Sequence, residues 1–308
     1  MRVQPPAVET LDLQFPPPSS ESGFGRFAPG YPVRIESGLP EASPLLGELF
    51  GAFQAGGASP PRSVYEIRRS RPRTRGFALR VKGKSVFVHK RIGRLLHELE
   101  WLVMNEVVSS PNPYFLIHAA SVSRGGCAVL LPGSRRAGKT TLAIALVLRG
   151  WRYLSDDIAA VCPEPLVAVP FPRHFSIRKD VRDLLAALSG GERRGSWVRP
   201  LKPSLDRFFS PDKLWKGSLG EPARVTHVIF PHHRPGVWPK FVPIGRAAAL
   251  RRLASHSWGI RQFGRRGVEI LADLVEGAEC GELWTGQVEE TCELLEGVCG
   301  AGRRGVRP

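Results

Sequence analysis

The chain has 308 residues, of which 42% are apolar and 23% charged, and its formal net charge is +16. That length allows one large domain or two of ordinary size, and the composition excludes a wholly disordered chain. No stretch approaches the ~18 consecutive apolar residues of a membrane span, and the N-terminal residues lack the apolar core of a signal peptide. We therefore expect a cytoplasmic protein with no membrane span.

The charge and the cysteines narrow the choice of partners and cofactors. Lys and Arg number 44 against 28 Asp and Glu, an excess that suits phosphorylated ligands, anionic lipids or nucleic acid. The basic residues are scattered along the chain and form no single stripe, which argues against a nucleic-acid partner. The cysteine count is odd and no CxxC pair occurs, so we expect neither a disulfide framework nor a zinc site.

Local composition divides the chain into four parts. Residues 1–30 are rich in Pro, Ser and Gly, which is typical of an irregular arm. Residues 31–110 mix helical and strand patterns and predict a small α+β region. Residues 111–299 predict an α/β domain, because short apolar runs alternate there with helical segments. Residues 300–308 are rich in Gly and Arg and predict a frayed tail.

The α+β region contains two hydrophobic periods. Helical spacing covers residues 44–55 and 91–109, and strand-like alternation covers 63–69, 77–82 and 85–89. The second helix is predicted to bury a stripe formed by Leu95, Leu96, Leu99, Leu102 and Val103.

The larger domain begins with a strand, a loop, a helix and a further strand. Apolar runs predict strands at 114–118, 128–131 and 151–155, and residues 139–149 predict a helix that ends at Gly150. A later strand is predicted at 225–231, followed by helices near 246–256 and 266–277. The strand–loop–helix–strand unit is the one that builds nucleotide-binding α/β sheets.

The loop before that first helix fits the phosphate-binding pattern G-x-x-x-x-G-K-[ST] at every defined position, from Gly133 to Thr140. Glycines let the backbone N–H groups surround a phosphate, and the helix adds the positive end of its dipole. In such a loop Lys139 reaches the β- and γ-phosphates, and the Thr140 hydroxyl ligates Mg²⁺. The residues predicted to bind the nucleotide are Gly133, Ser134, Arg135, Arg136, Ala137, Gly138, Lys139, Thr140 and Thr141.

Two adjacent carboxylates, Asp156 and Asp157, follow the strand at 151–155 and come 16 residues after Thr140. A P-loop enzyme needs a carboxylate at a strand end to hold the Mg²⁺ shell, and a base that accepts a proton from an attacking hydroxyl. We expect the pair to divide these two roles. The alternative is a solvated turn or a helix cap.

A histidine and a basic run adjoin these motifs. His118 ends the strand at 114–118, and if that strand lies beside the P-loop strand, the imidazole faces the phosphates. The alternative for His118 is a structural histidine. Arg173, Arg178 and Lys179 follow the aspartates, where cations can stabilise charge on a transferring phosphoryl group. A basic surface edge is the alternative for that run.

These residues together resemble the catalytic half of HPr kinase/phosphorylase. In that family a His precedes the P-loop strand, and a segment similar to R-G-H-R-L-V-A-D-D follows the P-loop helix. The counterparts in this chain are His118, the loop Gly133–Thr140 and the segment RGWRYLSDD at 149–157. HPr kinase-related proteins found beside peptide-modification and protein-sorting genes are similar at three further markers: PRHFSIRK at 172–179, VIFP at 228–231 and GRRG at 264–267.

The resemblance implies an α/β fold with a P-loop on a mixed, partly antiparallel sheet, of the HPr kinase and phosphoenolpyruvate carboxykinase type. It implies transfer of phosphate from ATP, with Mg²⁺, to a serine hydroxyl of a peptide or small protein. Asp156 is then the base, Thr140 and Asp157 hold the metal, and His118 is an active-site partner. Where HPr kinases have a Glu after the P-loop Ser, this chain has Thr141, as the carboxykinases do. HPr kinases are hexamers, so by analogy the resemblance also points to a homo-oligomer.

Three other functions are compatible with the same motifs. A nucleotide-binding scaffold of a peptide-modification system would bind ATP with little turnover. Thr141 hints at a kinase of a small metabolite. A nucleic-acid NTPase would require stimulation by DNA or RNA, and no helicase-type pattern accompanies the P-loop. The kinase of a peptide or small protein is therefore the leading hypothesis.

Overall fold

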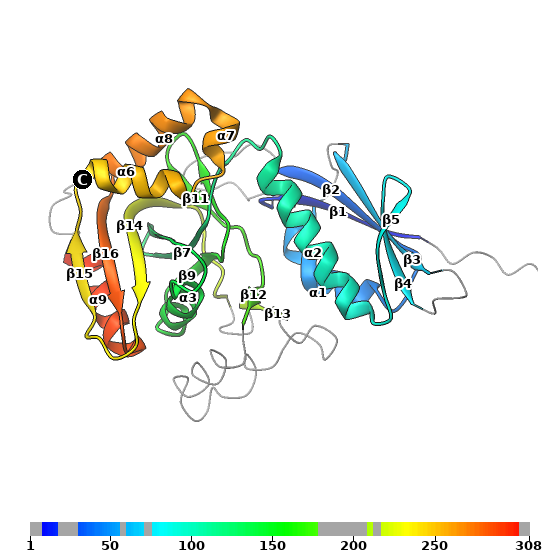
Figure 1. The fold of residues 1–308 in the computed structure, drawn as a ribbon, viewed down its shortest axis with the longest axis horizontal. Coiled ribbons are helices and arrows are strands. Elements are labelled where there is room, and N and C mark those ends of the chain that lie inside the picture. The colour runs from blue at the N-terminus through cyan, green and yellow to red at the C-terminus, as the bar shows by residue number, and fades with distance from the viewer. Residues whose placement is uncertain are drawn as a thin grey trace, which may run out of the picture. The chain divides into compact units, whose positions relative to one another are not determined.

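The computed structural model describes residues 8–17, 30–55, 60–70, 76–177, 208–211 and 217–301. They belong to two compact units, and the main division falls between Pro113 and Tyr114 (Figure 1). The sequence predicts a division after residue 110.

The first unit is an α+β fold whose described strands form one sheet in the order β1–β2–β3–β4–β5. Its strands are β1 (Glu9–Phe15), β2 (Tyr31–Ser37), β3 (Ser63–Arg69), β4 (Phe77–Val81) and β5 (Lys84–His89). Its helices are α1 (Ser43–Phe50), continued by a 3₁₀ turn (Gly51–Phe53), and α2 (Ile92–Ser109). Strands β2 and β3 are parallel, and the other neighbouring pairs are antiparallel.

Strand β1 corrects the expectation of an irregular arm over residues 1–30. Leu11, Leu13 and Phe15 alternate along it and are buried, and its backbone pairs with β2 over its whole length. The alternating pattern of this strand is difficult to recognise in the sequence, because prolines and serines are frequent on either side of it. Residues 1–7 and 18–29 of the predicted arm lie outside the described part.

Helix α2 confirms the predicted helix and most of its buried stripe. Leu95, Leu96, Leu99 and Val103 are at most 1% exposed, whereas Leu102 is half-buried. The stripe turns instead toward Met104 and Val107, because apolar residues three and four positions apart share one face of a helix.

The second unit is an α/β fold around a mixed sheet of nine described strands. The main path runs β6–β10–β11–β14–β8–β7–β9, and β16 pairs with both β14 and β15. The strands are β6 (Phe115–Ile117), β7 (Ala119–Arg124), β8 (Cys127–Pro132), β9 (Arg152–Ser155), β10 (Ala159–Cys162), β11 (Val167–Val169), β14 (Ala223–His233), β15 (Lys240–Pro243) and β16 (Glu279–Thr285). Two short strands, β12 (Phe175–Ser176) and β13 (Phe208–Phe209), lie outside this sheet.

Helices cover both faces of this sheet (Figure 1). They are α3 (Lys139–Leu148) and α9 (Val288–Ala301) on one face, and α6 (Arg246–Ser255), α7 (Gly259–Phe263) and α8 (Arg265–Glu276) on the other. Each face has its own buried core, one containing Leu131 and Ile229 and the other Leu130 and Val228. The sheet is therefore buried on both sides, as in other α/β folds. Among the described residues, no helix combines the length and apolar character needed to cross a membrane.

Three parallel strands determine where loops gather. Strand β14 pairs in parallel with β8 on one side and with β16 on the other. Their carboxyl ends, at Pro132, His233 and Thr285, therefore meet at one edge of the sheet. Ligands of open α/β sheets bind outside such an edge.

The strands beside β8, which precedes the Gly133–Thr140 loop, differ from the expectation in one respect. Strand β6, which matches the predicted strand at 114–118, pairs with β10 and not with β8. The strand beside β8 is β7, which starts immediately after His118 and also pairs with β9. Its sequence, AASVSR, consists mostly of small and polar residues, so it lacks the apolar run from which a strand is predicted. His118 still lies next to the end of β8, because it directly precedes β7.

Candidate functional site

A tight loop joins the end of β8 to the start of α3. Within it, Arg136 has a φ of 69° and Gly138 a φ of 92°, so the backbone turns through the left-handed region twice. A Cβ built on Gly138 would lie 3.4 Å from the Cβ of His233, at the end of β14. A Cβ on Gly133 would lie 3.1 Å from the Cβ of Ala137. The loop is thus closed on itself and held close to the neighbouring strand end, where glycine fits best.

Lys139 is drawn into the centre of this loop. Its Nζ donates to the carbonyl of Gly133 at 2.6 Å and to that of Ser134 at 3.1 Å, and the residue is only 5% exposed. Burial lowers the pKa of the ammonium, while the nearby Asp157 and Asp156 oppose that shift. The backbone of the loop therefore surrounds the buried ammonium group of Lys139.

The next residue, Thr140, contacts the buried member of the aspartate pair. Its hydroxyl lies 2.9 Å from Oδ1 and 3.2 Å from Oδ2 of Asp156, which is 3% exposed. Burial, together with the charge of Asp157, raises the pKa of Asp156 to about 7. The Thr140 hydroxyl and the Asp156 carboxylate thus place three oxygen atoms close together at the start of α3.

A sharp turn separates the two carboxylates. The N–H of Ile158 donates to the carbonyl of Asp156 at 2.9 Å, and Asp157 between them has a φ of 64°. This is the geometry of a γ-turn, and aspartate tolerates positive φ better than most residues. The turn gives the adjacent carboxylates different surroundings, so that Asp156 is buried while the Asp157 side chain is 40% exposed.

Asp157 is surrounded by cationic and imidazole groups. Its oxygens lie 3.8 Å from Lys139 Nζ, 3.7 Å from His118 Nε2 and 3.4 Å from Arg173. Burial alone would raise the pKa of Asp157, but the polar contact with His118 and the charges of Arg173 and Lys139 lower it to about 2. Asp157 is therefore ionised at neutral pH and accessible from solvent.

His118 links the site to the opposite face of the sheet. Its Nε2 lies 3.5 Å from Lys139 Nζ. The centroid of its ring lies 5.3 Å from that of the Trp258 ring and 6.1 Å from that of the His256 ring. The backbone N–H of His118 donates to the carbonyl of His256 at 2.6 Å. Burial lowers the pKa of His256, and the charges of His118 and Lys139 lower it further.

The structure thus brings together most of the residues singled out from the sequence. Contacts of 4 Å or less join Asp157 to His118, Lys139 and Arg173, and a separate contact joins Thr140 to Asp156, the residue next to Asp157 in the chain. Ser134, Arg135 and Arg136 are exposed on the loop, and Thr141 is half-buried on α3. Arg178 and Lys179 lie outside the described residues, as does the predicted tail beyond residue 301.

Four residues near the site escaped the sequence analysis. Trp258 and His256 adjoin His118, and His233 beside Gly138 lies 3.3 Å from the Thr285 hydroxyl. They come from the connection between α6 and α7 and from the ends of β14 and β16, far along the chain from the Gly133–Thr140 loop. The sequence has no signal for them, because long-range packing brings these segments together: the parallel pairing of β8, β14 and β16 positions His233 and Thr285, and the helices that pack on the sheet position His256 and Trp258.

The described residues contain no group of three or more His, Cys, Asp or Glu side chains that could hold a metal ion by themselves. A metal at this site would therefore need ligands from a bound substrate as well as from Thr140 and a carboxylate. That is the usual situation for Mg²⁺ at phosphate sites.

Comparison with known proteins identified no family. Neither a protein-family model nor a curated protein matches this chain. Among solved structures, the chain is similar to the Hpr(Ser) kinase/phosphatase from Coxiella burnetii at 14% identity, over 61% of this chain and 95% of that chain, with a TM-score of 0.27.

Proposed function

We propose that the second unit is an ATP-dependent phosphotransferase of the HPr kinase-related type, which phosphorylates a serine hydroxyl of a peptide or small protein. The observation that carries the proposal is the convergence of Lys139, Thr140 and two carboxylates at the end of β8. Lys139 Nζ and the nearest oxygen of Asp157 are 3.8 Å apart, and Thr140 contacts Asp156 at 2.9 Å. A phosphate-binding amine, a hydroxyl and a pair of carboxylates are the parts that phosphoryl transfer requires.

The donor set suits Mg²⁺. Thr140 and Asp156 offer oxygen atoms, which Mg²⁺ prefers, and nucleotide phosphates would complete the shell. Asp156 has its pKa raised to about 7, chiefly by burial, so a nearby cation would favour its charged form. When bound, Mg²⁺ would neutralise charge on the phosphates. We assign Thr140 and Asp156 to the metal side.

This assignment reverses the roles that the family resemblance implies for the two aspartates. Asp156 is 3% exposed and already occupied by the Thr140 hydroxyl, so a serine on another molecule would have little access to it. The Asp157 side chain is 40% exposed, ionised and 3.8 Å from Lys139. We assign Asp157 as the group that accepts the hydroxyl proton.

The remaining side chains hold and orient the reacting groups. Lys139 leaves its two carbonyl partners to bind the phosphates, and Arg173 lies 3.4 Å from Asp157, where its charge stabilises the transferring phosphoryl group. His118 contacts Asp157 at 3.7 Å and fixes the direction of that carboxylate. Since proton transfer is late in a loose transition state, a carboxylate of low pKa suffices as the base.

A label-transfer experiment tests the function. The full chain is incubated with γ-labelled ATP, Mg²⁺ and three acceptor pools: serine peptides, the same peptides with Ser→Ala, and hydroxylated metabolites. We expect label in the serine peptides alone. Label in the metabolite pool would identify a small-metabolite kinase. ATP binding by calorimetry without label in any pool would contradict a kinase and favour the nucleotide-binding scaffold.

A further inference from the structure

The Gly133–Thr140 loop lies between two sets of strand ends that differ in chemistry. Asp157 follows β9 and His118 precedes β7, so the groups proposed to act on the γ-phosphate lie on that side of β8. On the other side lie the ends of β14 and β16, because β14 pairs in parallel with both β8 and β16. A nucleotide whose γ-phosphate reaches Asp157 is therefore expected to extend its nucleoside toward β14 and β16.

The ends of these two strands lie directly against the loop. A Cβ built on Gly138 would lie 3.4 Å from the Cβ of His233 and 3.7 Å from the hydroxyl oxygen of Thr285. Thr285 is buried, whereas His233 is exposed. This side of the loop is therefore accessible to a ligand.

A short segment, residues 234–239, continues from β14 and lies over the end of β16. The N–H of Arg234 donates to the carbonyl of Thr285 at 3.0 Å. A Cβ built on Gly286 would fall 1.7 Å from the carbonyl oxygen of Val237, so the two backbones are in contact and only glycine leaves room for it. The segment has the sequence RPGVWP, and its two prolines restrict its backbone. These features hold the segment close to the Gly133–Thr140 loop.

Two apolar side chains of this segment are open to solvent. Trp238 is 77% exposed and Val237 is 39% exposed. Tryptophan is buried for most of its surface in a typical fold, so an indole this accessible is available to a ligand. Aromatic side chains stack on nucleobases, since every base has a flat π-face. The segment therefore offers a stacking surface on the side where the nucleoside is expected.

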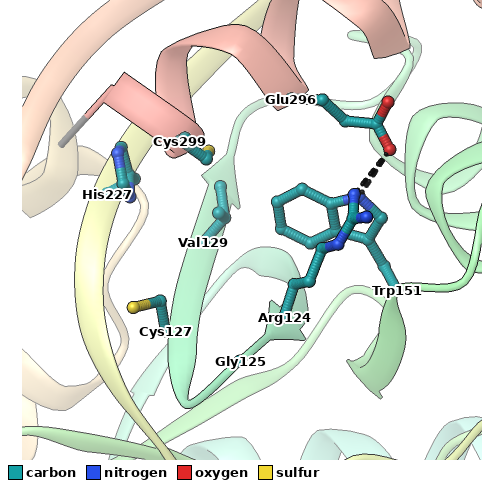
Figure 2. Close-up of a pocket in the computed structure, with 9 residues that line it drawn as sticks. Arg124, Gly125, Cys127, Val129, Trp151, His227, Glu296 and Cys299 are labelled. Carbon is teal, nitrogen blue, oxygen red and sulfur yellow. Dashed lines mark hydrogen bonds and ion pairs between the residues drawn. The ribbon is translucent and has the colours of Figure 1, made fainter. Parts of the chain in front are cut away.

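The cavity in the second unit, of about 520 Å³, offers no alternative place for the nucleoside. It borders Cys127, where β8 begins, whereas the loop follows Pro132, where β8 ends. At ~3.3 Å per residue along a strand, the two ends of β8 are about 17 Å apart. Figure 2 shows that Trp151 and Glu296, which form a hydrogen bond of 3.2 Å, belong to the wall of this cavity. The cavity is thus no part of a site at the loop.

We propose that residues 234–239 bind the nucleoside of ATP, with the indole of Trp238 stacked on the purine ring. This rests on the proposed function, because it takes ATP as the ligand of the Gly133–Thr140 loop. The loop and Lys139 bind the phosphates, and Trp238 distinguishes a nucleotide from a bare polyphosphate. Stacking tolerates any base, so we expect ATP and GTP to bind with similar affinity.

Calorimetric titrations of the full chain test the proposal by comparing ATP with inorganic tripolyphosphate, both with Mg²⁺. The measured quantity is the ratio of the two affinities. Trp238→Ala should lower that ratio about tenfold by weakening ATP alone, as the loss of one stacking contact predicts. Trp238→Phe should keep most of the ratio. Trp101→Ala is the matched control, because Trp101 is a 56% exposed indole on α2 in the first unit.

A second variant tests the position of the segment. Gly286→Ala places a methyl group against the carbonyl of Val237, so it should displace the segment and cause the same selective loss of ATP affinity. An unchanged ratio in Trp238→Ala, or equal losses for both ligands, would overturn the nucleoside site and leave the proposed function standing. A selective loss in Trp258→Ala instead would place the base beside His118 and also overturn it. Binding of neither ligand to the wild type would contradict the proposed function and the nucleoside site together.

Discussion

The Thr140 hydroxyl lies 2.9 Å from Asp156 Oδ1, although the two residues belong to a helix and to the turn after a strand. The carboxylate of Asp157, the residue after Asp156, contacts Lys139, His118 and Arg173 instead. The γ-turn at Asp157 thus gives two adjacent carboxylates different partners.

Lys139→Ala should weaken binding of ATP·Mg²⁺ by about tenfold to a hundredfold, the range expected for losing a charge-assisted contact to phosphate. Calorimetric titration measures the change. Lys240→Ala is the control, because Lys240 is an exposed lysine on β15. Equal affinities of Lys139→Ala and the wild type would show that the loop does not bind the triphosphate.

Gly138→Ala should destabilise the protein by about 1–2 kcal/mol, because an L-residue at a φ of 92° is strained. The same change should lower nucleotide affinity, since the loop would shift. Gly297→Ala is its counterpart within α9, where a Cβ meets nothing within 4 Å. That substitution should instead stabilise by up to ~1 kcal/mol. Urea denaturation of both variants gives the comparison, and a stabilised Gly138→Ala would refute the loop geometry.

Glu296→Gln should cost about 2 kcal/mol of folding free energy, because Glu296 joins α9 to Arg149 after α3 and to Trp151 before β9. Glu293→Gln on the same helix is the control. The Glu293 side chain is 67% exposed and lies 3.9 Å from Arg149, so its loss should cost less than ~0.5 kcal/mol. Equal effects of the two substitutions in urea denaturation would mean that the contacts of Glu296 contribute no more to stability than those of an exposed glutamate.

The pH dependence of stability should report on Asp156. Its pKa is raised from 3.8 to about 7, so the folded protein binds this proton more tightly than the unfolded chain does. The stabilisation is complete below about pH 4 and is lost as the pH rises toward about 7. Relative to Asp156→Asn, the wild type should therefore lose stability over that interval, with a slope of up to ~1.4 kcal/mol per pH unit. Urea denaturation in EDTA measures it, and parallel profiles would contradict the shift.

Local patterns predicted several elements of both units, including the helix at the candidate site. Strand β3 matches its predicted bounds, and α3 begins at Lys139 as the motif required. Gly150, at which the helix is predicted to end, has a φ of 92°, a backbone angle that suits glycine at a helix C-terminus. These features depend on hydrophobic period and on glycine geometry, which act over a few residues.

What the sequence did not predict depends on long-range pairing. Strand β7 has small, polar residues and becomes a strand because β8 and β9 pair with it on either side. His256 and Trp258 reach His118 only because the helices after β15 pack back onto the sheet. The different surroundings of Asp156 and Asp157 depend on burial, which the sequence of two adjacent aspartates does not reveal.

The most direct test of the account compares Asp156→Asn with Asp157→Asn in calorimetric titrations of ATP, with and without Mg²⁺. We predict that Asp156→Asn abolishes the gain in ATP affinity that Mg²⁺ confers on the wild type. Asp157→Asn should retain that gain while losing phosphate transfer. The opposite pattern, with Mg²⁺ dependence lost only in Asp157→Asn, would contradict the assignment, and an unchanged Mg²⁺ dependence in both variants would contradict the site itself.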